Sequence, residues 1–264
     1  MTKAQTAASS VIEEMVPARQ SSTARLIVKR AESYAEMEAA MRLRFEVFNL
    51  ELNEGLQASY LTGMDTDEYD EYCDHIIVMD TEKDMVVGAY RLLPGSRAER
   101  GPGFYSETEF ELSAIKRIEG EKVELGRACV RHAYRGSATL NLMWSGIARY
   151  IEEHRIGHLF GCGSIHTINP LLVSGIYSYL KTRYLTGERF RVTPIKRVPG
   201  FDPDAPFDKK AVAEQMPPLL SAYLRLGARI AGEPALDEQF GVSDLLIILD
   251  RDKILDRYKR HYFV

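Results

Sequence analysis

The sequence predicts an α/β protein built on a mixed sheet. Short apolar stretches typical of strands alternate along the chain with amphipathic stretches typical of helices, and no segment repeats. The length of 264 residues and the hydrophobic fraction of 45% are sufficient for a substantial buried core. We expect the folded part to form a single domain over residues 25–264.

Residues 1–24 differ in composition from the rest of the chain. Ala, Ser, Thr and Gln dominate them, and their apolar segment VIEEMV is short. Such a stretch buries too little apolar surface to offset the entropy lost on ordering. We expect a mobile N-terminal tail, and the alternative is an amphipathic contact with a membrane or a partner.

Hydrophobic spacing and turn residues predict the individual elements. In residues 34–52, apolar side chains recur at spacings of three and four, which predicts a helix. The turn TEKD separates two apolar stretches and predicts a hairpin. The expected strands begin with LIVKR and continue with residues 75–79, 86–93, 123 onward, 158–165, 190–195 and 245–249. The further expected helices are residues 105–115, 138–153, 170–184, 219–231 and 253–262.

Charge and cysteine content exclude several classes of protein. The net charge of −4 argues against a dedicated nucleic-acid binder. Cys73, Cys129 and Cys162 form no CxxC pair, so we expect neither a disulfide framework nor a metal site. No apolar run approaches the roughly 20 residues that span a bilayer, and the N-terminus lacks the apolar core of a secretory signal. We expect a cytoplasmic protein.

The stretch VELGRACVRHAYRGSATLNL is the most informative part of the chain. Glu124 and Arg127 are charges inside an apolar strand, where burial without partners is costly. Their spacing of three predicts that they lie on opposite faces of the strand. Arg131, Arg135 and Gly136 follow where a helix begins, and free backbone N–H groups there favour an anion. This pattern suggests a group-transfer enzyme whose donor carries phosphate, and the alternative is a set of structural ion pairs.

The loop MDTDEYDEYCDH holds six acidic residues between Asp65 and Asp74 and no basic one. Like charges packed together destabilise a fold unless a cation or solvent relieves them. We consider a solvated loop, a calcium site and a pocket for a cationic substrate such as an amine. The spacing, glycine and final glutamate of an EF-hand are absent, which argues against calcium. Arg91 interrupts the following apolar strand, and we expect it to face solvent or to pair with this loop.

Two further features carry charge or reactive groups. Residues 181–197 contain six basic side chains and one acidic residue, Glu188, in an otherwise acidic protein. This basic stretch is either a dock for an acidic partner or a solvated surface. Cys162 in GCGS is interpreted as a buried thiol, because no histidine is placed to activate it in an evident motif.

Seven residues in series resemble the signature of a known group of enzymes. The group is the N-acyl amino acid and acyl-homoserine-lactone synthase branch of the GCN5-related N-acetyltransferase fold, and within it the chain resembles the ornithine lipid synthase (L-ornithine N-alpha-acyltransferase, hemolysin-like) family. The seven residues are Arg44, Phe48, Asp67, Asp70, Arg91, Glu124 and Arg127. Matching stretches include RLRFEVF, VGAYRLLP, ELGRACV, GCGSIH and the C-terminal PPLLSAYLRLGA block, over about residues 26–264.

The resemblance implies a fold and a reaction. The fold is a mixed central sheet flanked by helices, with a C-terminal extension. In the reaction, the α-amine of an amino acid, ornithine by resemblance, attacks a long-chain (3-hydroxy)acyl thioester on acyl carrier protein or, less often, on coenzyme A. The products are a lyso-ornithine lipid or similar N-acyl amino acid and a free phosphopantetheine thiol, and no bound cofactor is implied. The alternatives are a lactone-type signal synthase, a coenzyme A-dependent acetyltransferase and a non-catalytic acyl-binding module.

The resemblance also implies roles for the residues on the acceptor side. The substrate ammonium must lose a proton before it attacks, and Glu124 is the implied base, acting directly or through water, with Arg127 as a second catalytic residue. Asp67 and Asp70 are expected to bind ammonium groups. The arginines expected to hold the substrate carboxylate, or the acidic loop itself, are Arg44 and Arg91.

The donor side is expected to use the turn after the central strand. Backbone N–H groups near Cys129 and Val130 are implied to stabilise the oxyanion, with Arg131, Arg135 and Gly136 at the phosphate. The turn departs from the family pattern (Q/R)-x-x-G-x-(G/A), because larger side chains replace small ones after Gly136. A carrier protein presents a single phosphate, so this departure favours acyl carrier protein as donor and the basic stretch as its dock.

The C-terminal segment combines basic and aromatic residues. Lys253, Arg257 and Arg260 lie beside Tyr258 and Tyr262. Such a helix either lies on anionic lipid, which would place the enzyme peripherally at the inner face of the membrane, or packs its aromatic side chains on the sheet.

Overall fold

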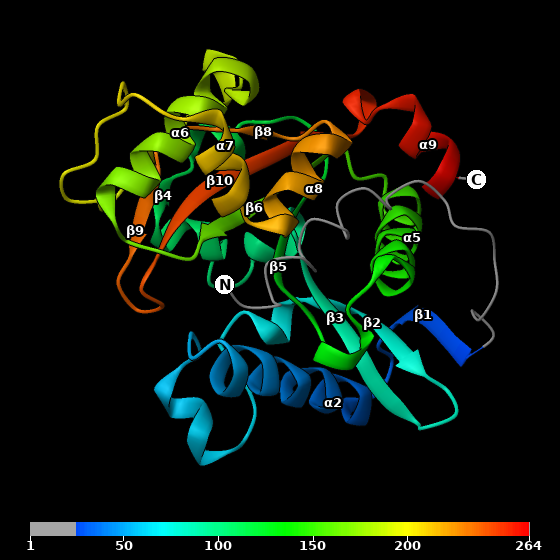
Figure 1. The fold of residues 1–264 in the computed structure, drawn as a ribbon. Helices are drawn as coiled ribbons and strands as arrows, with labels where there is room; N and C mark the ends of the chain where they lie inside the picture. The colour runs from blue at the N-terminus through cyan, green and yellow to red at the C-terminus, as the bar shows by residue number, and fades with distance from the viewer. Residues whose placement is uncertain (1–24, 264) are drawn as a thin grey trace. The chain divides into compact units, whose positions relative to one another are not determined.

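The computed structural model describes residues 25–263, which form two compact units (Figure 1). The first unit holds the residues up to Leu92, then Arg127–Glu153 and Phe263; the second holds Leu93–Gly126 and His154–Tyr262. The mixed α/β class is confirmed. The expected tail, residues 1–24, lies outside the described residues. The expectation of a single domain over residues 25–264 stays a prediction.

The first unit contains an antiparallel sheet with a long helix on each face (Figure 1). Strand β2 pairs with β1 on one side and with β3 on the other, where His75 lies opposite Arg91. The predicted hairpin is confirmed, because residues 81–84 join β2 to β3. The elements are β1 (Leu26–Arg30), α2 (Tyr34–Phe45), β2 (Asp74–Asp80), β3 (Met85–Pro94), which runs on into the second unit, and α5 (Ser137–Glu153).

Successive residues of β2 face the two different helices, as the period of two in a strand requires. Ile77 belongs to a buried cluster with Ala40 and Leu43 of α2. On the other face, a Cβ atom added at Gly146 of α5 would lie 2.8 Å from Cγ2 of Ile76. Glycine at this position therefore allows α5 to approach the sheet closely.

Helix α2 has a defined start and an unusual end. It begins at a capping box, in which Ser33 Oγ accepts a hydrogen bond from the backbone N–H of Glu36 and the Glu36 carboxylate accepts one from that of Ser33. Beyond Phe45 the chain forms a π-helical turn, Glu46–Glu51, and not the continuous α-helix predicted to residue 52. Such turns occur frequently at functional sites.

The second unit contains a mixed sheet. Strand β6 pairs in parallel with the start of β5, where Phe160 lies opposite Glu124, and antiparallel with β10. Strand β10 also pairs with β8 and β9. The strands are β5 (Lys122–Val130), whose last residues belong to the first unit, β6 (His158–Ile165), β8 (Arg229–Ile230), β9 (Ala235–Asp237) and β10 (Val242–Asp250).

Helices and a small ladder complete the second unit. Strands β4 (Phe110–Glu111) and β7 (Thr193–Pro194) pair with each other. The helices are α3 (Gly95–Ala98), α4 (Ser113–Lys116), α6 (Pro170–Tyr184), α7 (Lys209–Gln215), α8 (Pro218–Leu226) and α9 (Asp256–Tyr262).

Three predicted elements of this unit are wrong in extent or type. The helix expected over residues 219–231 ends at Leu226, because Gly227 adopts the left-handed conformation with φ 115° and the chain continues as β8. Residues 105–115 form a 3₁₀ turn, β4 and α4 in place of one helix, and residues 190–195 contain only the two-residue strand β7. Short apolar runs do not distinguish these elements by periodicity.

Among the described residues, none of the helices is long and apolar enough to cross a bilayer. Helix α9 buries Tyr258 and Tyr262, whereas Arg257 and Arg260 are exposed. The aromatic residues thus pack on the protein, and contact of the basic residues with lipid stays a prediction.

Candidate active site

A buried network of charges in the first unit connects the acidic loop to α2 and β3. Arg44 Nη1 donates to Asp70 Oδ1 at 2.6 Å, and Arg44 Nη2 donates to Asp65 Oδ1 at 2.6 Å. From β3, Arg91 Nη1 donates to Asp67 Oδ1 at 2.5 Å and to Asp70 Oδ1 at 3.2 Å. Arg44 and Arg91 were expected to hold either the substrate carboxylate or the acidic loop, and in this structure both contact the acidic loop.

Burial makes the pairing in this network essential. Arg44 and Asp65 are fully buried, and Asp70 and Arg91 are 6% and 5% exposed. Burial by itself raises the pKa of Asp70, but Arg44 and Arg91 outweigh it and hold that pKa well below its usual range. Burial likewise lowers the pKa of Arg91, and the neighbouring aspartates raise it above its ordinary value. A solvated surface loop is therefore the wrong interpretation for Asp65 and Asp70.

Arg127 approaches the same network from β5. Its Nε lies 3.7 Å from Asp65 Oδ1, its Nη2 lies 3.7 Å from Asp67 Oδ2, and its guanidinium lies over the ring of Phe48 at 5.7 Å. The φ of Arg127 is 51°, a left-handed conformation that costs about 1–3 kcal/mol in a non-glycine residue. Successive side chains alternate between the two faces of a strand only while its backbone is extended, and the backbone is not extended at Arg127. The spacing of three therefore no longer predicts that Glu124 and Arg127 lie on opposite faces.

His75 belongs to this network, although the sequence analysis did not single it out. It is 1% exposed on β2, and its Nε2 lies 3.8 Å from Asp70 Oδ1. Burial lowers the pKa of His75 by more than Asp70 raises it, so the imidazole is neutral at pH 7. The available signal was a polar residue at the second position of the apolar strand DHIIVMD.

The expected donor turn also lies in the first unit, between β5 and α5. Arg131 pairs with Glu46 at 2.6 Å, and the Arg135 guanidinium donates to both carboxylate oxygens of Glu51. Both glutamates come from the π-helical turn after α2. A Cβ atom added at Gly136 would meet no described atom within 4 Å, so the backbone there is open to close approach.

The end of β5 is held by its neighbour β3. The backbone N–H of Arg131 donates to the carbonyl of Val87 at 2.8 Å. Burial raises the pKa of the Cys129 thiol to about 12, so this side chain is a core residue and not a nucleophile. The oxyanion role expected of backbone N–H groups near Cys129 and Val130 stays a prediction.

Glu124 lies in the second unit, where two consecutive residues hold its carboxylate. Oε2 accepts a hydrogen bond from the backbone N–H of Tyr105 at 2.8 Å, and Oε1 accepts from the backbone N–H of Ser106 at 2.7 Å and from its hydroxyl. Glu124 is 5% exposed. Ser106 Oγ lies 3.4 Å from Cys162 Sγ, and desolvation raises the pKa of that thiol, which argues against a nucleophilic role, although the residue is half-buried and not fully buried as expected.

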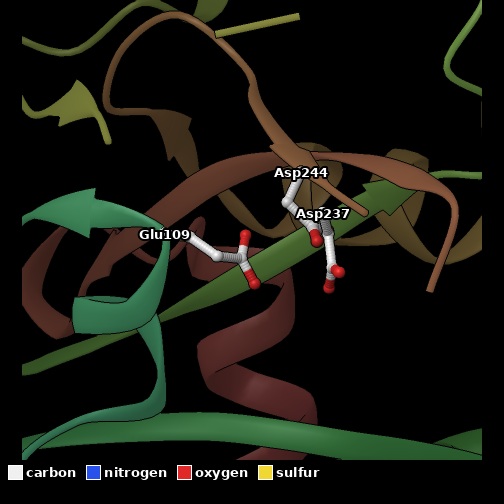
Figure 2. A group of neighbouring side chains, drawn as sticks. All are labelled: Glu109, Asp237 and Asp244. Carbon is white, nitrogen blue, oxygen red and sulfur yellow. The ribbon is translucent and has the colours of Figure 1, made fainter. Parts of the chain in front are cut away.

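Three buried carboxyl groups of the second unit, which we call the acidic triad, lie close together (Figure 2). Glu109 precedes β4, Asp237 ends β9, and Asp244 lies within β10. One oxygen of each lies within 4.8 Å of the others, and Tyr105 Oη lies 3.4 Å from Asp237 Oδ2. Within residues 25–263 these carboxylates have the spacing to hold a metal ion or another cation, which the sequence analysis did not expect.

The triad was not predicted from the sequence, because its members belong to segments that are distant along the chain. Asp244 carried the one available signal, since it is a charge inside the apolar strand VSDLLIILD. The same type of signal identified Glu124. Neither Glu109 nor Asp237 stands out from its local sequence.

The predicted site residues thus fall into two groups. Arg44, Asp67, Asp70, Arg91 and Arg127 come together in one network of the first unit. The donor-turn residues belong to that unit as well. Glu124 has its own network in the second unit, with Tyr105, Ser106 and the nearby triad.

Comparison with known proteins identifies the class of this fold. Residues 43–145 match the acetyltransferase (GNAT) domain family. A coenzyme A-dependent acyl-homoserine lactone synthase matches with a TM-score of 0.54 and 17% identity over 90% of each chain. An N-acyl amino acid synthase from uncultured soil microbes matches with a TM-score of 0.52 and 13% identity over 89% of this chain and 97% of its own. The fold is that of a GNAT acyltransferase.

Curated relatives narrow the class to a family. The chain is 36% identical over 250 residues to an L-ornithine N(alpha)-acyltransferase of Brucella abortus (strain 2308), covering 90% of this chain and 88% of that relative. It is 36% identical over 253 residues to the enzyme of the same name from Rhizobium meliloti (strain 1021), covering 90% and 84%. The chain belongs to the L-ornithine N(alpha)-acyltransferase family and is an N-acyltransferase. The family predicted from the motifs is confirmed.

Proposed function

We propose that the protein transfers a long-chain acyl group from a phosphopantetheine thioester to the α-amine of ornithine. The observation that carries the proposal is the 36% identity, over 90% of the chain, to relatives named for ornithine acylation. The product is N-acylornithine, an amphiphile with one acyl chain, and the second product is the free thiol of the donor.

In this reaction the amine nitrogen attacks the thioester carbonyl carbon, the C–N bond forms and the C–S bond breaks. The attacking nitrogen must first lose a proton, because an ammonium group has no free electron pair. We assign the acceptance of this proton, directly or through one water, to the Glu124 carboxylate. The hydrogen bonds from Tyr105 and Ser106 fix the orientation of that carboxylate before the substrate arrives. After the attack the nitrogen gives up a second proton as the amide forms, and the departing thiolate takes up a proton to give the free thiol.

The charged network of the first unit supports an acceptor-binding role. Asp70 is occupied by Arg44 and Arg91, so its contribution is to hold those guanidinium groups in place. Asp67 Oδ2 is buried without a hydrogen-bond partner among the described residues, which leaves it able to accept an N–H of the substrate. Arg127, strained in its backbone and close to Asp65 and Asp67 of the loop, is the proposed second catalytic residue.

For the donor, we propose acyl carrier protein, with Arg131, Arg135 and Gly136 near its single phosphate and the backbone N–H groups around Cys129 and Val130 at the oxyanion. The exposed basic stretch is the proposed dock. Arg189 and Arg191 are exposed there, whereas Lys181 pairs with Asp204 at 2.5 Å. Acidic carrier proteins are attracted to such a surface at a distance.

The test is a product assay by mass spectrometry on the full chain. The protein is given long-chain acyl and 3-hydroxyacyl carrier protein, or the matching coenzyme A thioesters, with a mixture of amino acids. We expect N-acylornithine, and we expect Glu124→Gln to lower kcat by roughly 100- to 10,000-fold, the usual contribution of a general base. Glu111→Gln, which removes an exposed carboxylate of the same unit, is the matched control. Acylation of other amines only, or full activity of Glu124→Gln in a folded protein, would contradict the proposal.

A further inference from the structure

We propose that the acidic triad, Glu109, Asp237 and Asp244, binds the side-chain ammonium of the amino-acid substrate. The identity of this cation as the δ-ammonium of ornithine rests on the proposed function. The existence of a cation pocket at the triad rests on the geometry of the second unit alone.

The number and spacing of the oxygens match an ammonium group. An –NH₃⁺ group has three N–H donors, and the triad presents one carboxyl group to each. Acceptors placed about 2.8 Å from one tetrahedral nitrogen lie roughly 4.6 Å from one another. The three triad oxygens lie within 4.8 Å of one another, which accommodates this arrangement. Each member comes from a different segment of the chain, and the Glu109 carboxyl group faces Asp237 and Asp244, which lie beside each other (Figure 2).

The triad also contains hydrogen-bonding capacity that the described residues do not satisfy. Both carboxyl oxygens of Glu109 and Oδ1 of Asp244 are buried, and no lysine, arginine or backbone N–H in residues 25–263 donates to them; their polar neighbours are each other and the Cys162 thiol beside Glu109. Asp237, in contrast, accepts from the backbone N–H of Phe240 at 3.0 Å. A buried acceptor without a donor is costly, and a bound ammonium group would satisfy these oxygens.

The triad differs from the acidic loop, whose aspartates pair with Arg44 and Arg91. No lysine or arginine of the described part of the chain pairs with Glu109. Burial, together with Asp244 and Asp237, raises the pKa of Glu109 far above its ordinary value. Burial and Asp237 also raise the pKa of Asp244, against the opposing effects of Ser164, of a hydrogen bond with Glu109 and of His166. A proton shared between Glu109 and Asp244 is therefore favoured at this site, and a bound ammonium group would replace it.

Two residues connect the triad to the proposed base. The backbone N–H of Tyr105 donates to Glu124 while its hydroxyl lies 3.4 Å from Asp237 Oδ2. Ser106 donates to Glu124 and lies 3.4 Å from Cys162 Sγ, beside Glu109. Ornithine carries its two amines at opposite ends of a methylene chain. With the δ-ammonium in the triad, its α-amine is presented on the side of Glu124.

The test compares ornithine with norvaline, which has the same carbon chain without the δ-amine. The full chain is assayed with both acceptors as wild type, Asp244→Asn, Asp237→Asn and the surface control Glu111→Gln. We expect the ratio of kcat/KM for ornithine to that for norvaline to fall by roughly 10- to 150-fold in Asp244→Asn, the range for lost hydrogen bonds to a charged group. Asp237→Asn should lower the ratio in the same direction, and Glu111→Gln should leave it unchanged.

Three outcomes would overturn the inference. A wild type that acylates norvaline as well as ornithine, or amide variants that lose both activities equally, would remove the triad from substrate recognition while the proposed acyltransferase function stands. A stoichiometric metal in the purified protein that Asp244→Asn loses would make the triad a metal site. Calorimetric binding of ornithine and norvaline provides a readout without turnover, so the pocket is tested even if the proposed reaction itself fails.

Discussion

Replacing Arg44 by methionine should destabilise the first unit strongly, because the change leaves two buried carboxylates without their main partner. Arg44 is fully buried and makes three hydrogen bonds, one to Asp65 and two to Asp70. Methionine fills a similar volume but supplies no donor. The substitution therefore isolates the electrostatic contribution from packing.

The size of the effect follows from burial. Removing one partner of a buried ion pair typically costs about 3–5 kcal/mol, because the remaining charge stays desolvated. Arg91 still contacts Asp70 at 3.2 Å in the variant, so we expect the lower part of this range, about 3 kcal/mol. For a chain of this size that corresponds to a decrease in Tm of roughly 6–12 °C.

The assay is urea denaturation followed by circular dichroism, with Arg42→Met as the matched control. Arg42 lies on the same helix and pairs with Glu38 at 2.7 Å, but its side chain is 54% exposed, so its loss should cost only about 0.3–0.5 kcal/mol. A difference below about 1 kcal/mol between the two variants would refute the reasoning.

The pH dependence of the Arg44→Met effect provides a second check on the same prediction. Asp70 has a pKa below its ordinary value in the folded protein. A lowered acid pKa stabilises the fold at pH values above the unfolded pKa, and this stabilisation is lost as the pH falls through the folded pKa. The wild type should therefore keep this stabilisation from pH 8 to pH 5. In the variant, burial raises the pKa of Asp70 with only Arg91 opposing it, so the variant takes up a proton more readily and the difference between the two proteins should shrink as the pH falls.

Two further predictions concern charge in the second unit. Glu109→Gln should stabilise the protein relative to wild type, and this gain should grow from pH 5 to pH 8 by up to about 1.4 kcal/mol per pH unit. The reason is that the pKa of Glu109 is raised in the folded protein, so the wild type loses stability over this range as the side chain ionises in the unfolded chain only. Thermal melts between pH 5 and pH 8 measure the gain, and a gain independent of pH would contradict the prediction. Reversing the charge at the exposed Arg189 and Arg191 should raise the apparent KM for an acyl carrier protein donor. The KM for the matching coenzyme A thioester should stay unchanged. Equal KM values for the carrier donor in wild type and variant would exclude the basic stretch as the binding surface for the carrier protein.

Hydrophobic periodicity predicted the alternation of strands and helices, the β2–β3 hairpin and long helices such as α6, because these features depend on neighbours within a few residues. It failed where tertiary contacts or a single backbone angle determine where a helix ends or which type of helix forms. Gly227, with φ 115°, ends a helix whose apolar pattern continues, and the π-helical turn after α2 has an unremarkable sequence.

The sequence by itself determined the family, through motifs in series, and the importance of Glu124 and Arg127, through charges placed inside an apolar strand. Only the tertiary structure decided how those charges are paired. Asp65 and Asp70 became partners of Arg44, and Glu109, Asp237 and Asp244 became a triad, because segments far apart in the chain meet when the sheet forms. A local sequence shows that a charge is buried, but the partner that stabilises it comes from the fold.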